Sequence, residues 1–164
     1  MTLRRPAQQR GFFLVEAMVA ILIFALGILG LVAMGGTAVS SQSDAQYRTE
    51  ASSLADAIAG QIALGINRAG VDETARAANK AASLAAYAHQ AGGPPCASAG
   101  AATGPGPVLN LLNQAQAILP GANPAYQQII IDGLGSFNRV EITLCWQTAS
   151  DLVPRRHTVV TYVN

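Results

Sequence analysis

Glu16 is the residue of this chain whose type and position most clearly imply a chemical role. It is the only charged residue in the apolar run from Gly11 to Gly36. A carboxylate inside a membrane-length helix costs a few kcal/mol on insertion scales, so such residues are rare and usually functional. We interpret Glu16 as the partner of a cation. The alternative is a carboxylate that reaches the nearby interface and stays hydrated there.

The apolar run is long enough to span a membrane. Phe12 to Met34 comprise 23 residues, and a helix rising about 1.5 Å per residue covers the roughly 30 Å hydrocarbon core with that length. Three arginines and no acid precede the run, at Arg4, Arg5 and Arg10. This charge bias predicts a cytoplasmic amino terminus, with everything after about Gly36 outside the cytoplasm.

A secretory signal peptide is the alternative interpretation of this segment. Such a peptide has an apolar stretch of about 7 to 15 residues followed by a small-x-small cleavage site. Here the run is longer and Glu16 interrupts its start, although Ala38-Val39-Ser40 fits a signal-peptidase site. The sequence therefore favours a retained anchor over cleavage near Ser40.

The chain beyond the apolar run has an amphipathic pattern. Apolar residues recur every three or four positions from Tyr47 to Ile66, which predicts that the helix continues out of the membrane. A continuous helix from Phe12 to Ile66 would be on the order of 80 Å long. Glycines within it either weaken the helix or allow close packing between helices, and the sequence leaves this open; they are Gly27, Gly30, Gly35 and Gly36.

The rest of the chain suits one modest domain that begins with helices and loops. About 128 residues follow Gly36, enough for one domain rather than two. Ala69 to Ala91 is alanine-rich and favours a helix with acids near its start, whereas Gly92 to Pro107 has the composition of a loop. Val108 to Leu119 has helical spacing and is followed by Pro120-Gly121, which predicts a short helix.

The last forty residues predict β-structure. The expected strands are Gln128 to Asp132, Arg139 to Gln147 and His157 to Val163, with a turn at Gly133 to Ser136. Alternate residues from Val140 to Trp146 form one apolar face of the middle strand. We therefore predict an α+β fold in which an antiparallel meander packs on the outer half of the long helix.

Two cysteines, Cys96 and Cys145, lie in the region placed outside the cytoplasm. An oxidising compartment favours a disulfide between them. Closing a loop of about 50 residues contributes roughly 4 kcal/mol in the chain-entropy model. The alternative is two free cysteines that act as small apolar residues.

Composition and motifs argue against catalysis, metal binding and nucleic-acid binding. The chain is 51% hydrophobic and 12% charged with a net charge of +1, so it offers no basic face for nucleic acid. His89 and His157 lack partners at the spacing of a metal site, and no phosphate loop or G-x-S-x-G motif occurs. We expect no enzymatic activity, no cofactor and no metal; the acids are too scattered for a calcium site.

The amino-terminal residues resemble a known class of exported proteins. Arg10-Gly11-Phe12-Phe13-Leu14-Val15-Glu16-Ala17, followed by an apolar helix, is similar to the class III signal of type IV prepilins and pseudopilins. The resemblance implies that a prepilin peptidase cuts between Gly11 and Phe12 and methylates the new amino group. Phe13 departs from the usual Thr or Ser, but the glycine and the glutamate are in place.

The resemblance gives each part of the amino terminus a purpose. Cleavage after Gly11 keeps the apolar segment as an anchor and removes three basic residues, which takes the side-chain charge from +1 to −2. The new amino group at Phe12 is a cation near the bilayer, and Glu16 of a neighbouring subunit is its expected partner because a charge in hydrocarbon must be paired. The expected parts are a leader (1–11), a transmembrane helix (12–36), its amphipathic continuation (37–66) and a periplasmic head (67–164).

Within this superfamily the chain looks most like PilV-type minor pilins. The similar segments are Ala25 to Leu31, Leu119-Pro120-Gly121, Cys145-Trp146 and Thr158 to Tyr162. The resemblance implies an inner-membrane protein with a periplasmic head that enters a cell-surface pilus at low abundance and helps to initiate its assembly. Its expected partners are the prepilin peptidase, the major pilin, other minor pilins, the inner-membrane assembly platform and a tip adhesin. The alternatives are a minor pseudopilin of type II secretion and a single-pass protein with a periplasmic binding head.

Overall fold

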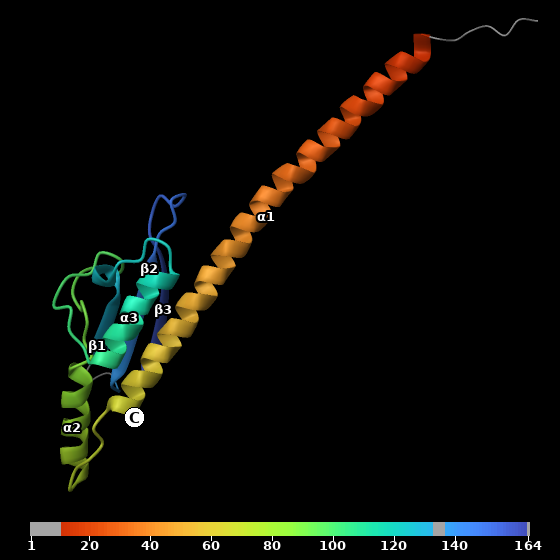
Figure 1. Cartoon of the computed structure of the whole chain (residues 1–164). Helices are drawn as coiled ribbons and strands as arrows, with labels where there is room; N and C mark the ends of the chain where they lie inside the picture. Colours follow the sequence, from red (N-terminus) through yellow and green to blue (C-terminus); the bar gives the residue numbers. More distant parts are fainter. Residues whose placement is uncertain (1–10, 133–136, 164) are drawn as a thin grey trace, which may run out of the picture. The chain divides into compact units, whose positions relative to one another are not determined.

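The computed structural model describes residues 11–132 and 137–163. In chain order (Figure 1) the elements are α1 (Gly11–Gly65), α2 (Glu73–Ala85), α3 (Gly106–Ile118), the 3-10 helix η1 (Pro124–Tyr126), β1 (Gln128–Asp132), β2 (Arg139–Trp146) and β3 (Arg155–Tyr162). The chain divides into two units, residues 1–44 and 45–164. The turn predicted at Gly133 to Ser136 lies outside the described residues.

The described part of the first unit is the amino-terminal portion of α1. None of its side chains from residue 12 to 44 is buried, although most of them are apolar up to Met34. By length and composition α1 can cross a membrane, and the exposure of its apolar residues distinguishes it from the core helix of a soluble protein. The prediction of one helix from Phe12 to Ile66 is correct to within a residue at each end, and the glycines do not interrupt it.

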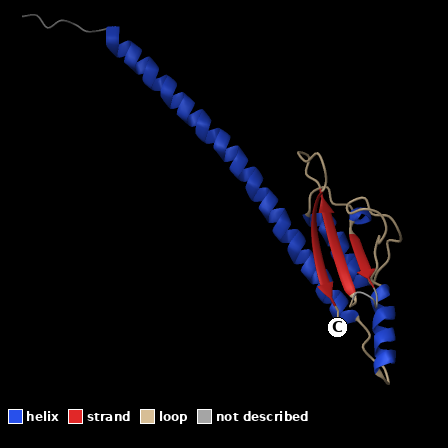
Figure 2. Ribbon diagram, turned by 180° about the vertical axis from the view of Figure 1, so that it is seen from behind, coloured by secondary structure: helices blue, strands red, loops and turns tan. Residues whose placement is uncertain are grey.

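The second unit combines helices with a three-stranded antiparallel sheet in the order β1-β2-β3. Ile142 at the centre of β2 pairs with Ile129 on β1 and with Val159 on β3. Figure 2 shows the strands in front of α3 and the carboxyl-terminal part of α1, so both helices cover the same face of the sheet. The predicted α+β class, with a meander packed on the outer part of the long helix, is confirmed, and the arrangement is consistent with a pilin-like fold.

The hydrophobic core lies between that face and the two helices. The stripe that the sequence predicts on α1 is buried, because its three- and four-residue spacing places these side chains on one side of the helix. Each fully buried aliphatic side chain contributes roughly 1.5 to 3 kcal/mol. The buried core residues on these elements are Ala51, Leu54, Ala55, Ile58 and Ile62 on α1, Val108, Leu112 and Ala115 on α3, and Ile129, Val140, Ile142, Leu144 and Trp146 on the sheet.

Helix α2 is shorter than the predicted range Ala69 to Ala91. Asp72 caps its start, where the carboxylate accepts a hydrogen bond of 2.7 Å from the backbone N–H of Ala75, satisfying one of the free donors of the first turn. The helix ends at Ala85, and His89 then pairs with Ile129 as an isolated β-bridge. Pairing with the sheet edge thus overrides the helix propensity of the alanines that follow.

The end of α3 agrees with the predicted stop at Pro120-Gly121. Gly121 has φ = 61°, and a side chain there would collide with the carbonyl oxygen of Gln147. The neighbouring carbonyl of Pro120 accepts a hydrogen bond of 2.9 Å from the backbone N–H of Gln147. Glycine is therefore required where the loop after α3 meets the end of β2.

The predicted apolar face of the middle strand is buried, and at one end of the sheet the opposite face is buried as well. Thr143 and Cys145 point away from the helices, and yet both are buried. The segment around Cys96 covers them, because a disulfide and side-chain hydrogen bonds hold that segment against the sheet. Alternation along a strand reports which side chains share a face, but it does not predict a loop that packs on the second face.

Candidate functional site

The predicted processing site lies at the start of α1. Gly11 is the first residue of the helix, and Phe12 and Glu16 follow in its first turns with exposed side chains. Glu16 is four positions after Phe12, and helical side chains lean toward the amino terminus, so the Glu16 carboxylate lies on the same face of the helix as Phe12. Arg4, Arg5 and Arg10 lie outside the described residues.

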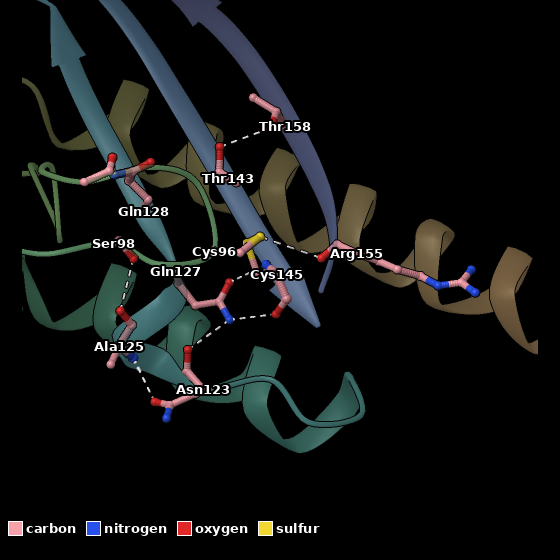
Figure 3. Close-up of a disulfide and its surroundings, with 11 residues drawn as sticks. Cys96, Ser98, Asn123, Ala125, Gln127, Gln128, Thr143, Cys145, Arg155 and Thr158 are labelled. Atoms are coloured by element: carbon pink, nitrogen blue, oxygen red, sulfur yellow. Dashed lines mark hydrogen bonds between the residues drawn. A yellow bond between two sulfur atoms is a disulfide. The ribbon is translucent and has the colours of Figure 1, made fainter. Parts of the chain in front are cut away.

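The two cysteines belong to the second unit and are bonded to each other. The sulfur atoms of Cys96 and Cys145 are 2.04 Å apart, and their Cα atoms are 5.5 Å apart. Cys145 is buried on β2, whereas Cys96 has φ = 66° in the covering segment. Figure 3 shows the bond on the face of the sheet away from α1. The disulfide therefore fastens residues that are 49 positions apart in the sequence.

Gln127 was not predicted to matter, yet it supports the buried cysteine. Its side-chain N–H donates to the carbonyl of Cys145 at 3.0 Å and to that of Asn123 at 3.1 Å. Its side-chain oxygen accepts from the backbone N–H of Cys145 at 2.7 Å. The side-chain amide thus forms a backbone-like pair with Cys145 just before the start of β1 (Figure 3).

Gln128, the first residue of β1, holds the segment around Cys96 against the sheet. Its side-chain amide donates to the carbonyls of Gln90 and Gly92, at 3.0 Å each. Both glutamines are fully buried, and a buried amide is stable only when its polar atoms are paired. No local pattern in the sequence distinguishes these two glutamines from surface glutamines.

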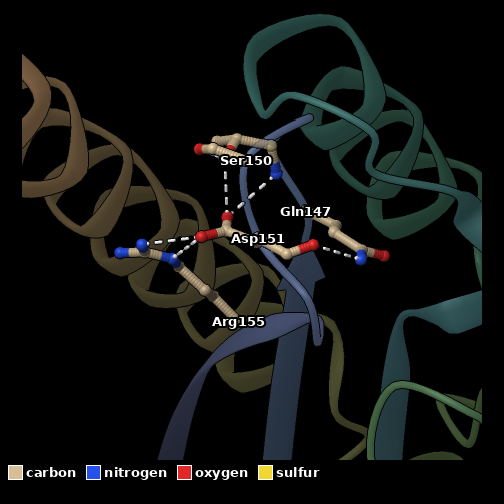
Figure 4. A network of polar contacts seen from close by, with 5 residues as sticks. Gln147, Ser150, Asp151 and Arg155 are labelled. Atoms are coloured by element: carbon tan, nitrogen blue, oxygen red, sulfur yellow. Dashed lines mark hydrogen bonds and ion pairs between the residues drawn. The ribbon is translucent and has the colours of Figure 1, made fainter.

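A second polar cluster lies in the loop between β2 and β3. Arg155 donates to one carboxylate oxygen of Asp151 through Nε at 2.9 Å and through a terminal nitrogen at 2.7 Å. The backbone N–H and the hydroxyl of Thr148 donate to the other oxygen, at 3.0 and 2.7 Å. Gln147 donates to the Asp151 carbonyl at 2.9 Å (Figure 4).

These donors change the acidity of the loop carboxylate. The hydrogen bonds from Arg155 and then Thr148 favour the charged form and lower the pKa of Asp151 from 3.8 to about 2. The carboxylate is therefore ionised at any pH at which the protein is expected to work. The sequence alone does not predict this cluster, because its residues form no motif with a known spacing.

A shallow groove of about 640 Å³ lies beside β3. It offers hydroxyl groups together with charges of both signs, so it has no evident preference for an anion or a cation. Its lining residues are Arg48, Thr49, Ser52, Ser53, Asp56 and His157. Among the described residues no group of three His, Cys, Asp or Glu side chains is placed to hold a metal ion.

The fold and the amino-terminal helix define a class of protein: an α+β head on a helix that can anchor it in a membrane. Residues 6–32 match the sequence model of the prokaryotic N-terminal methylation motif. No curated protein and no solved structure matches the chain. The match supports a type IV pilin-like protein or pseudopilin that a prepilin peptidase processes.

Proposed function

We propose that this chain is a minor pilin that helps to initiate type IV pilus assembly and enters the pilus at low abundance near its tip. The observation that carries the proposal is the methylation motif at residues 6–32, which leads directly into α1 with Glu16 near its start. Pilin-like proteins of this kind are structural, and the polar clusters of the head hold its own loops together, which suits a building block.

The proposed processing prepares the chain for assembly. Cleavage between Gly11 and Phe12 frees an amino group at the end of an apolar helix. A cation and a carboxylate in hydrocarbon are each costly alone, so the amino group of one subunit and Glu16 of its neighbour are natural partners. This ion pair would fix the axial position of each subunit's helix relative to that of its neighbour in the filament.

The proposed organisation assigns a purpose to each part of the chain. Residues 1–11 are the leader, 12–36 the transmembrane helix, 37–66 its amphipathic continuation and 67–164 the periplasmic head. The helix holds the subunit in the inner membrane before assembly, and the disulfide suits a head in an oxidising compartment. The head then presents the surface that meets other minor pilins or a tip adhesin.

Mass spectrometry of sheared pili tests this proposal. We expect an amino-terminal peptide that begins with N-methylated Phe12, at a small fraction of the amount of the major subunit. Deleting the gene should reduce the number of pili and leave protein secretion unchanged. Loss of secretion with normal piliation would indicate a pseudopilin instead, and a mature chain that begins near Ser40 would contradict both assignments.

A further inference from the structure

Two adjacent apolar side chains project from the loop between β2 and β3. Leu152 is 98% exposed and Val153 is 70% exposed, and Pro154 follows them. Single exposed apolar side chains are common on protein surfaces. Here, however, two of them share the tip of a loop whose neighbouring residues are tied down.

The Asp151 cluster holds the loop on both sides of this tip. Asp151 accepts hydrogen bonds from Thr148 before the tip and from Arg155 after it, and its backbone N–H donates to the carbonyl of Thr148 at 3.1 Å. The tip itself is left exposed by this arrangement. A preorganised apolar tip binds more favourably than a mobile one, because less conformational entropy is lost on contact.

The loop between β2 and β3 lies at the end of the second unit where that unit begins, near Ala45 of α1. Trp146 and Arg155 form the last pair of the β2-β3 ladder. His157, two positions after Arg155 on β3, lines a groove with Arg48 and Thr49 of α1. Figure 1 shows the other end of β3 at the opposite end of the sheet, near the carboxyl-terminal end of α1.

Chain length restricts how far this end can be from the apolar segment. Ala45 is nine positions after Gly36, so the two residues are at most about 30 Å apart in an extended chain and about 14 Å apart along a helix. If residues 12–36 lie in a membrane, the entry end of the second unit stays within that distance of the lipid. The tether also raises the effective concentration of any weak contact between the loop and the bilayer.

The chemistry of the loop suits a lipid surface. Its acid, Asp151, is paired with Arg155, while Arg156 is exposed close to the apolar tip. Apolar side chains that enter the headgroup region beside a cation are typical of proteins that touch anionic membranes. Pro154 helps because it has no backbone N–H to dehydrate.

We propose that Leu152 and Val153 insert into the headgroup region of the anchoring membrane, with Arg156 facing anionic lipid. This contact would set the tilt of the head before the subunit leaves the membrane. It rests on the proposed function only in that residues 12–36 must span the bilayer. A second subunit seated on the tip is the competing occupant, and the experiment separates the two.

Photocrosslinking of the full chain in nanodiscs tests the contact. Leu152 is replaced by p-benzoylphenylalanine in discs of phosphatidylethanolamine and phosphatidylglycerol that hold one copy. The matched control replaces Phe137, which is 78% exposed and lies two positions before β2, at the other end of the sheet. We expect at least about tenfold more lipid adducts at position 152 than at position 137, because only the former lies at the interface.

Three results would overturn the proposal. Equal or absent lipid adducts at the two positions in discs would show that the tip does not reach the bilayer. Crosslinks from position 152 only to protein, in cell membranes, would assign the tip to a neighbouring subunit. Release of the chain from membranes by alkaline carbonate would remove the anchor itself and the proposed function with it, whereas retention without lipid adducts contradicts the loop contact alone.

Discussion

The two units of this chain use the same residue types in different ways. Ile21 and Ile58 both lie on α1, but Ile21 is 68% exposed and Ile58 is fully buried. In the described part of the first unit, residues 12–44, no side chain is buried, so the order of neighbouring residues is what an enzyme or a membrane can recognise. In the second unit the fold depends on contacts between distant residues, such as Cys96 and Cys145.

This difference explains how a short amino-terminal segment can match a known sequence pattern. A processing signal must keep particular residues at particular positions, and residues 6–32 do so. A packed head needs only apolar periodicity, suitable turns and paired polar groups, which many sequences satisfy. The comparison therefore predicts that substitutions in the first unit impair recognition, whereas those in the second unit impair stability.

Gly11→Val is expected to have the largest effect. The larger, β-branched side chain crowds the scissile bond, so the precursor should accumulate with residues 1–11 attached and should not enter pili. Intact-mass measurement of the membrane-bound chain checks this. Gly27→Val is the matched control, since a side chain at Gly27 meets no neighbouring atom, and it should be processed normally. Mature Gly11→Val protein would contradict the proposed cleavage position.

Glu16→Ala is expected to impair assembly without impairing insertion. Alanine is less costly than a carboxylate in hydrocarbon, whereas leaving a neighbour's amino group unpaired costs about 3 to 5 kcal/mol. The measurement is the amount of the chain in sheared pili relative to membranes. Glu16→Gln keeps the size and removes the charge, so it should behave like Glu16→Ala. An unchanged ratio would mean that Glu16 only contacts the interface.

Removing the disulfide should destabilise the second unit by about as much as the unpaired amino group costs in the Glu16 variants. We expect Cys96→Ser with Cys145→Ser to lower the free energy of unfolding by roughly 4 kcal/mol, from the entropy of the closed loop. Urea denaturation of the full chain, followed by Trp146 fluorescence, measures the loss. Reduced wild-type protein should unfold at a similar urea concentration. Thiols that can be alkylated in the native, unreduced protein would contradict the bond.

Much of the fold could be predicted from the sequence because its signals are local and periodic. The limits of α1, the buried stripe around Ile58 and the three strands follow from apolar spacing and β-branched composition. Strand ends were less accurate, since β3 begins at Arg155 rather than His157. The ion pair and ladder bonds at Arg155 extend the strand into residues of low β-propensity.

The features that sequence analysis did not reveal depend on distant partners. Gln127 and Gln128 have no local pattern that distinguishes them from surface glutamines, and their burial follows from the segment around Cys96. The Asp151 cluster likewise requires the turn that brings Thr148 and Arg155 to one carboxylate. Such polar pairs become visible only when the backbone is known.

Ile58→Ala and Ile21→Ala compare the two units on one helix. Deleting a buried isoleucine side chain costs about 2 to 5 kcal/mol through lost burial and the cavity that remains, so Ile58→Ala should lower the free energy of unfolding of the head by that amount. Ile21→Ala should leave it unchanged, because Ile21 is 68% exposed and its removal leaves no cavity in the core. Denaturation of both variants under identical conditions is the check, and equal losses would contradict the comparison.

The smallest expected effect concerns acid stability at Asp151. Its pKa is lowered from 3.8 to about 2 in the folded chain by hydrogen bonds from Arg155 and Thr148. The folded state therefore binds this proton less readily than the unfolded state, so the stabilisation is fully present above pH 3.8 and is lost as the pH falls toward 2. Asp151→Asn should lower stability at neutral pH and reduce the loss of stability between pH 4 and 2. Because the carboxylate is near the surface, high salt should weaken the effect.

Thermal unfolding of wild type and Asp151→Asn, measured across this pH range, tests the prediction, with Asp56→Asn on α1 as the control. Parallel profiles for wild type and Asp151→Asn would mean that the cluster orders the loop without stabilising the head.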